Sequence, residues 1–437
     1  MRPLHLAATG LLAVVLLPSA PTYAAGETCQ GRPATVVGTP GQLGLLGSEA
    51  DDVVVTNGAV TVETLGGADL VCVTDGGVYA GSDVGTGAGN DVVDASATRG
   101  QVEAVLGTGS DTYLGSPAQD RVITGQGGDA LDTEVDTVVS TSGGSATSQG
   151  DEVESGSPGL PNSDDIRLTG LGNTVYWAGV MSAAGRLEVG PESTLTPRLG
   201  TGALAVDAAA GTLTEDDATM LRWTGPFVRF NLYGSKAPRS LDFAGSERDE
   251  VLYTSFDDFD GAQRFDLGAG DDTLLSSDGR GGDGSAYVGG AGADVIDLWG
   301  GKRLAVDLGR RTWTSQGDAG RIAGWEQVRV GADRLDLRGT KRADDLQFYA
   351  CTATVAGRAG NDTLVANRTG DASYVLSCRD ARKSDITVRG DAGRDTISGT
   401  RGRDLLIGGP GRDTINGNAN RDRCSGEKLT SCEVRLR

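Results

Sequence analysis

Acidic side chains recur at a fixed spacing near the C-terminal end of the chain. An aspartate stands every nine residues, and a glycine precedes each one by five residues. The spacing is a period of nine residues that repeats four times without a gap. The acidic charge of the chain suits a cation as ligand. The aspartates are Asp395, Asp404, Asp413 and Asp422, and the glycines are Gly390, Gly399, Gly408 and Gly417.

The nine-residue period also predicts the fold. It fits neither a helix nor a simple alternating strand, but it fits a turn of six residues followed by a strand of three. Glycine and asparagine tolerate the positive φ of such turns. Two units would make one coil, and stacked coils would form two parallel sheets around one buried apolar residue per unit. The expected inward residues are Ile397, Leu406, Ile415 and Cys424.

These four units resemble the G-G-x-G-x-D-x-U-x repeat of the RTX (haemolysin-type calcium-binding) family. The resemblance implies an all-β, right-handed parallel β-roll or β-helix solenoid with Ca²⁺ bound between the turns of successive coils. It also implies that Asp395 shares an ion with Asp413, and Asp404 with Asp422. The alternative is a metal-free solenoid in which the aspartates only cap turns.

Degenerate copies of the repeat extend toward the N-terminus. Gly357 to Val365 and Gly289 to Asp297 match the full unit, so Asp362 and Asp294 join the candidate ligands. Further copies begin about 20 residues apart, which predicts one coil per copy. Their first residues are Gly47, Gly66, Gly87 and Gly107.

A second and longer duplication is visible in the middle of the chain. Leu204-Ala-Val-Asp207 reappears as Leu304-Ala-Val-Asp307, and Trp223 corresponds to Trp325. We interpret the chain as five segments. These are a signal peptide (1–24), a degenerate RTX-like solenoid (25–150), a less repetitive β region (151–266), a second solenoid segment (267–378) and the nonapeptide repeats with a cysteine-closed cap (379–437).

The composition excludes several classes of function. The chain has 437 residues and a net charge of −21, and its one histidine, His5, lies in the predicted leader. A Ser-His-Asp triad and a histidine-ligated zinc site are therefore excluded. The acidic charge argues against a nucleic-acid partner and favours a cation. No segment beyond the leader is apolar enough to span a membrane.

The leader and an even number of cysteines predict an exported protein with disulfides. Six cysteines allow 15 pairings. Proximity in the sequence favours Cys29–Cys72, Cys351–Cys378 and Cys424–Cys432.

We therefore expect a secreted, calcium-binding repeat protein with a structural or adhesive role and no chemistry of its own. A cell-surface or extracellular polysaccharide is a candidate partner. The alternative function is a secreted polysaccharide-active β-helix enzyme with an RTX-like tail, which could use paired carboxylates without histidine. The candidate pairs are Asp216-Asp217, Asp257-Asp258 and Asp271-Asp272.

Overall fold

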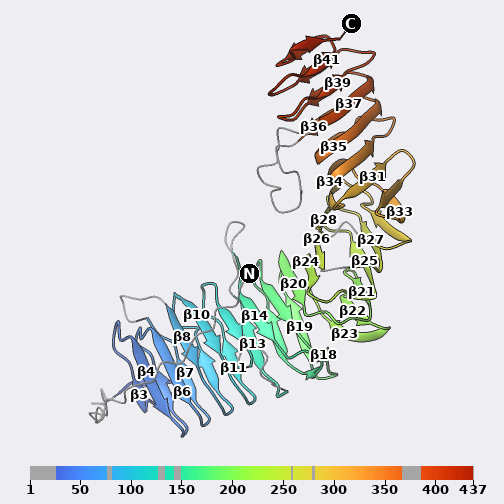
Figure 1. Cartoon of the computed structure of the whole chain (residues 1–437). Coiled ribbons are helices and arrows are strands. Elements are labelled where there is room, and N and C mark those ends of the chain that lie inside the picture. The colour runs from blue at the N-terminus through green and yellow to red at the C-terminus, as the bar shows by residue number, and fades with distance from the viewer. Residues whose placement is uncertain are drawn as a thin grey trace, which may run out of the picture.

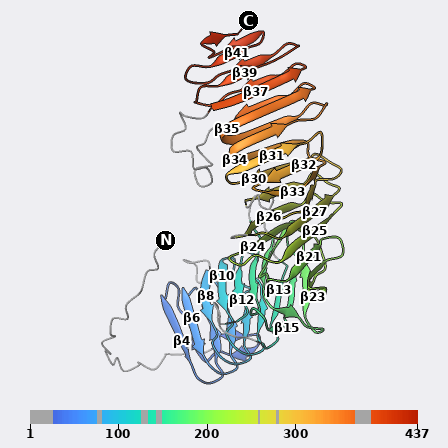
Figure 2. The same ribbon diagram turned by 45° about the vertical axis from the view of Figure 1, so that its right-hand side comes forward.

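The protein is an elongated, all-β parallel solenoid in the computed structural model (Figures 1 and 2). This confirms the predicted fold class. None of the described elements is a helix, so none of them could cross a membrane as one. The predicted leader lies outside the described residues. The structure describes residues 26–75, 81–125, 133–141, 149–256, 259–277, 281–366 and 385–436.

One parallel sheet runs along the whole solenoid, because each of its strands pairs with a strand of the next coil. Its strands, in spatial order, are β4 (Gly44–Ser48), β6 (Thr61–Leu65), β8 (Gly81–Gly85), β10 (Gln101–Val105), β12 (Arg121–Ile123), β14 (Glu152–Ser155), β17 (Thr174–Trp177), β20 (Ser193–Pro197), β24 (Phe227–Gly234), β26 (Val251–Phe256), β28 (Thr273–Ser276), β30 (Val295–Trp299), β34 (Gln327–Arg338), β35 (Asp345–Ala359), β36 (Thr363–Ala366), β38 (Thr396–Ser398), β40 (Thr414–Asn416) and β42 (Lys428–Thr430).

The opposite wall of the solenoid is built from three successive groups of parallel strands. The long strands β34 and β35 serve both walls, since their first and second halves pair with different neighbours. The first group is β3 (Val36–Val37), β5 (Val53–Val55), β7 (Leu70–Cys72), β9 (Val92–Asp94), β11 (Thr112–Leu114), β13 (Thr137–Ser140), β16 (Asp165–Leu168) and β19 (Arg186–Val189). The second is β21 (Ala203–Asp207), β25 (Ser240–Ser246), β27 (Ala262–Gly268), β29 (Ser285–Val288) and β33 (Asp318–Ala323). The third is β31 (Arg303–Asp307), the second halves of β34 and β35, β37 (Asp385–Ala392), β39 (Leu405–Ile407), β41 (Arg423–Ser425) and β43 (Val434–Arg435).

The core lies between the two walls and is built from inward residues that stack from coil to coil. In the nonapeptide region the predicted inward residues Ile397, Leu406, Ile415 and Cys424 are at most 1% exposed. Burying one such aliphatic side chain contributes about 1.5–3 kcal/mol. A coil therefore gains its stability from the coils above and below it.

The longer duplication corresponds to two antiparallel excursions from the solenoid. β21 continues into β22 (Thr212–Glu215) and β23 (Ala218–Arg222), and β31 continues into β32 (Thr312–Ser315) and β33. Trp223 and Trp325 follow the third strand of each excursion, and both are buried. The repeated sequence thus encodes a repeated supersecondary unit.

Short strands and disulfides complete the fold. β1 (Thr28–Cys29) pairs antiparallel with β2 (Arg32–Pro33), and β15 (Pro161–Asn162) pairs parallel with β18 (Val180–Met181). The bonds Cys29–Cys72 and Cys424–Cys432 confirm two of the predicted pairs. The third predicted pair includes Cys378, which lies outside the described residues. The solenoid bends where β20, β24 and β26 lie (Figures 1 and 2).

Candidate metal centre

The four nonapeptide units stack with two units per coil, as their spacing predicts. Strand β38 pairs with β40, so that Ile397 lies opposite Ile415. Strand β39 pairs with β41, so that Leu406 lies opposite Cys424. The first unit therefore faces the third, and the second faces the fourth. The turns that precede these strands carry the predicted aspartates.

Each predicted aspartate is buried, and its backbone is hydrogen-bonded to the acid one coil further along. The N–H of Asp362 donates to Oδ1 of Asp395 over 2.9 Å, and the N–H of Asp395 donates to Oδ1 of Asp413 over 3.0 Å. In the other turn of the coil, the N–H of Asp404 donates to Oδ1 of Asp422 over 2.9 Å. The structure thus brings together the pairs that the sequence predicts, in two columns that we call carboxylate ladders.

Most carboxylates in the two ladders have a second oxygen that no hydrogen bond reaches. Among the described residues, Oδ2 is buried and without a hydrogen-bond partner in Asp362, Asp395, Asp413 and Asp422. The side chains themselves are at most 1% exposed. Buried carboxylate oxygens of this kind are costly unless a donor or a cation satisfies them.

Glycine at the first position of each unit leaves space beside this oxygen. A Cβ at Gly390 would lie 2.2 Å from Oδ2 of Asp395 and 2.7 Å from the carbonyl oxygen of Gly408. A Cβ at Gly408 would lie 2.1 Å from Oδ2 of Asp413. A side chain would therefore fill the space that a carboxylate and a carbonyl oxygen share. The same contact exists at Gly417, whose Cβ would lie 2.4 Å from Oδ2 of Asp422.

The fourth position of the unit needs glycine for a different reason. Gly393 and Gly411 have φ values of 148° and 151°, and a Cβ at either would lie within 1.6 Å of a carbonyl oxygen in the preceding coil. Asn420 takes the same place in the fourth unit with φ of 76°. These turns therefore stack backbone to backbone, and their spacing along the solenoid is fixed.

Four aspartates of the two ladders have pKa values above that of an isolated aspartate. Burial, chiefly, and like charges on neighbouring acids raise the pKa of Asp362 and of Asp422 to about 6. Burial also raises the pKa of Asp395 and of Asp413. A bound cation would offset the repulsion between these acids and would therefore lower their pKa values, because a nearby positive charge favours the ionised form.

The residues present fit a calcium ion. The described residues contain no group of three or more His, Cys, Asp or Glu side chains that could hold a metal ion by themselves. A cation here would therefore take backbone carbonyl oxygens in addition to the aspartate oxygens, which is the mixed ligand set that Ca²⁺ accepts. The unpartnered oxygens of Asp362, Asp395, Asp413 and Asp422 are the side-chain groups that would hold it.

The arginines that precede the aspartates do not enter the ladders. All four side chains are exposed, as expected for a solvated face. They are Arg394, Arg403, Arg412 and Arg421.

The weaker copies of the repeat also form ladders. In the N-terminal solenoid the N–H groups of Asp52, Asp69 and Asp91 donate in turn to Oδ1 of Asp69, Asp91 and Asp111, over 2.7–2.8 Å. These copies stack one per coil, as their spacing predicts. In the middle of the chain, the ladder that contains Asp294 joins Glu250, Asp272, Asp294 and Glu326.

The sequence analysis did not identify the glutamates that end several ladders. Glu326, Glu427 and Glu433 accept the N–H of Asp294, Asp413 and Asp422. Their spacing from the preceding aspartate is irregular, so the nine-residue period gives no signal for them. It also gave no role to the serine or threonine that follows the first glycine in some units.

The carboxylate pairs considered for glycan cleavage have structural partners. Asp216 and Asp217 form the tight turn between β22 and β23, with φ of 49° and 66°, and Asp216 forms an ion pair with Arg239. Asp271 accepts the N–H of Ala293 and donates its own N–H to Asp249. Asp257 and Asp258 lie outside the described residues.

Comparison with known proteins gives one family match. A search of curated proteins finds no significant match to this chain. Residues 389–424 match the family model of the RTX calcium-binding nonapeptide repeat, in four copies. These residues are the four units whose turns carry the C-terminal ladders. Residues 389–424 are thus four RTX calcium-binding nonapeptide repeats, and they form one part of the parallel solenoid.

Proposed function

We propose that this protein is an exported solenoid that binds Ca²⁺ at its C-terminal turns and has a structural or adhesive role outside the cell, with no chemistry of its own. The observation that carries the proposal is the row of buried, unpartnered Oδ2 atoms in the RTX turns. Ca²⁺ would satisfy these oxygens and offset the repulsion between stacked carboxylates. Export is supported by the leader-like N-terminus and the two disulfides.

Calorimetric titration of the mature protein with Ca²⁺ tests this proposal. With a Kd on the order of 10⁻⁴ M, typical of extracellular calcium modules, ~1 mM Ca²⁺ would stabilise the fold by about 1.4 kcal/mol for each independent site. The melting temperature and the circular dichroism of the C-terminal coils should therefore depend on Ca²⁺. Identical melting in Ca²⁺ and in EDTA, with no heat of binding, would contradict it.

A polysaccharide partner is supported by a groove at the bend of the solenoid. The groove has a volume of about 900 Å³ and lies over β12, β14, β17, β20, β24 and β26. The rings of Tyr233 and Tyr253 pack edge to face at its wall, and Tyr176 also lines it. Tyr233 is exposed and the other two rings are half-buried. Tyrosine rings beside charged groups suit a sugar, which presents apolar C–H faces and hydroxyls together.

The carboxylates of this groove are engaged in ion pairs, which supports binding rather than hydrolysis. Arg121 contacts Glu152 at 3.0 Å and Glu154 at 3.8 Å. Retention of the protein on immobilised polysaccharides tests the partner. Tyr233→Ala should abolish retention, whereas Tyr349→Ala, outside the groove, should not. Release of reducing ends from those polysaccharides would instead support the enzyme.

A further inference from the structure

Five of the carboxylate ladders begin at an acid that its own turn already satisfies. In each case the unit has serine or threonine at its second position, directly after the first glycine. The backbone N–H and the hydroxyl of this residue both donate to the acid four positions later. The pairs are Ser48 with Asp52, Ser116 with Asp120, Ser246 with Glu250, Thr340 with Asp344 and Thr400 with Asp404.

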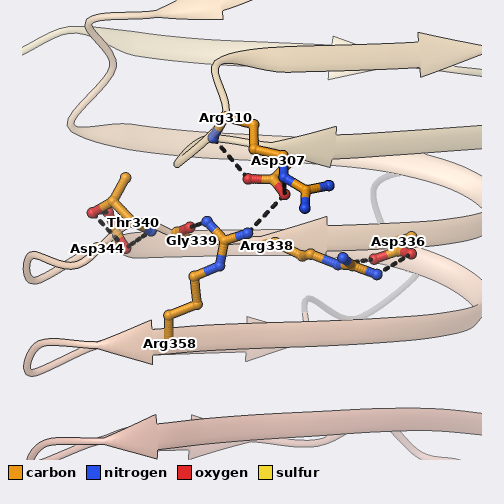
Figure 3. Close-up of polar contacts among 8 residues, drawn as sticks. All are labelled: Asp307, Arg310, Asp336, Arg338, Gly339, Thr340, Asp344 and Arg358. Carbon is orange, nitrogen blue, oxygen red and sulfur yellow. Dashed lines mark hydrogen bonds and ion pairs between the residues drawn. The ribbon is translucent and has the colours of Figure 1, made fainter.

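The geometry is best seen at the two threonines. The N–H of Thr400 lies 2.6 Å from Oδ2 of Asp404, and its hydroxyl lies 3.0 Å from both carboxylate oxygens. Thr340 holds Asp344 in the same way, with 2.6 Å from its N–H to Oδ2 and 2.9 Å from its hydroxyl to Oδ1 (Figure 3).

The same hydroxyl also orders the turn. It accepts the N–H two residues further on, from Gly402 over 2.8 Å and from Arg342 over 3.0 Å. Serine and threonine are well suited to such local side-chain to backbone bonds. The turn is therefore closed by its own side chain, and we call it a closed turn.

The closed turns hold the first acid of each of these ladders. In the C-terminal ladders, four aspartates accept at Oδ1 the N–H of the preceding ladder acid, and their buried Oδ2 atoms have no hydrogen-bond partner. They are Asp362, Asp395, Asp413 and Asp422. At Asp404 and Asp344, the N–H and the hydroxyl of the threonine in the same turn donate to the carboxylate. Neither Asp404 nor Asp344 appears among the acids with an unpartnered buried oxygen.

The acid of a closed turn already accepts hydrogen bonds from its own turn, so a cation would gain little by binding there. Binding Ca²⁺ at Asp404 would break charge-assisted hydrogen bonds to Thr400, whereas binding at Asp413 would satisfy an oxygen that has no partner. The second residue of the Asp413 unit is Gly409, which has no hydroxyl to offer.

We propose that the serine or threonine at the second position replaces calcium in the first turn of each ladder. Thr400 then closes the Asp404 turn against the cation, while the turns of Asp362, Asp395 and Asp413 take it. This inference rests on the proposed calcium function and specifies which turns serve it. It leaves each ladder with a metal-independent end, from which the calcium-dependent turns continue.

The test uses the full mature protein and five variants. Thr400→Ala removes the hydroxyl, and Thr400→Ser keeps it. Thr396→Ala is the matched control, because this exposed threonine lies in the neighbouring unit outside the turn. In EDTA, Thr400→Ala should lower the melting temperature by roughly 2–4 °C, and Thr400→Ser and Thr396→Ala should not. In a calcium titration, Thr400→Ala should bind one ion more than the wild type.

Asp404→Asn is an independent test, because it changes the acid directly and does not rely on removing the hydroxyl of Thr400. It should leave the number of bound Ca²⁺ ions unchanged, whereas Asp413→Asn should lose at least one. Loss of an ion in Asp404→Asn, or an unchanged ion count together with unchanged melting in Thr400→Ala, would overturn the inference. If the wild type binds no Ca²⁺, the proposed function fails, and the EDTA melting of the Thr400 variants still decides whether the hydroxyl closes the turn.

Discussion

The backbone N–H of Asp395 donates to Oδ1 of Asp413, 18 residues further along the chain and one coil away, over 3.0 Å. Asp404 lies closer in the sequence but belongs to the other turn of the coil, where it donates to Asp422. The repeat therefore couples alternate units, and adjacent units share no ladder. This relationship determines which substitutions should act together.

Asp395→Asn and Asp413→Asn should be strongly non-additive in Ca²⁺ binding. If the two acids share an ion, either change removes it, and the double variant loses no more than one of the single variants. Asp395→Asn combined with Asp404→Asn should show no such coupling. A double-mutant cycle read by calcium stoichiometry checks this, and coupling of Asp395 to Asp404 instead would contradict the two-units-per-coil arrangement.

Stability without calcium should fall as the pH rises through the titration range of Asp91. Burial, chiefly, and the neighbouring Asp69 raise the pKa of Asp91 from 3.8 to about 6. Between these values the folded protein holds a proton that the unfolded chain has released, so unfolding becomes easier with increasing pH. Above the raised pKa, the free energy of unfolding no longer changes with the protonation of Asp91.

Urea midpoints measured in EDTA from about pH 4 to about pH 7 check this dependence. Other groups titrate in the same range, so the comparison with Asp91→Asn isolates the effect. The urea midpoint of Asp91→Asn should rise relative to that of the wild type as the pH increases. A difference that is constant across the range would refute the assignment.

Gly408→Ala should destabilise the repeats and weaken calcium binding together. The new Cβ would lie 2.1 Å from Oδ2 of Asp413, so the carboxylate must move. Overpacking of this kind costs about 1–3 kcal/mol. Gly44→Ala is the matched control, because nothing lies within 4 Å of a Cβ there. Equal unfolding free energies and equal calcium affinities of the two variants would show that the space beside Asp413 is not needed.

Cys432→Ser should loosen the last coils without unfolding the rest of the solenoid. The Cys424–Cys432 bond ties the chain beyond β41 back to an inward position of the core. Opening so short a loop costs about 2–3 kcal/mol, and in a repeat array the loss stays local. Hydrogen exchange should quicken in β41, β42 and β43, while exchange in β5 and β7 should not change.

Much of this arrangement could be predicted from the sequence, because the nine-residue period corresponds to one structural unit of the solenoid. Ile397, Leu406 and Ile415 each recur after nine residues, and one inward residue per unit is what two short strands per coil require. The pairing of alternate units follows directly. The copies that begin at Gly47, Gly66 and Gly87 also keep their spacing, so their stacking could be predicted.

The remaining features have no periodic signal. Thr400 stands at the second position of its unit, where the motif has glycine but these units vary. The sequence pattern therefore gives it no role, although its hydroxyl changes what the turn can bind. Glu427 and Glu433 end their ladders at spacings set by the last turns of the fold. The groove around Tyr233 combines residues from strands of several coils, so no single repeat unit carries a signal for it.

The hydrogen bonds of the ladders all point the same way along the solenoid, from the amide of one coil to the carboxylate of the next, and this gives the molecule a polarity. A coil that forms after its predecessor finds a donor already in place for its acid. A coil that forms first does not, unless its turn is closed by serine or threonine. Assembly is therefore favoured in the direction of synthesis, and each closed turn is a point at which it can start afresh. For the same reason, shortening the protein from its C-terminal end leaves the remaining acids with their donors, whereas shortening it from the other end exposes a carboxylate that has lost one.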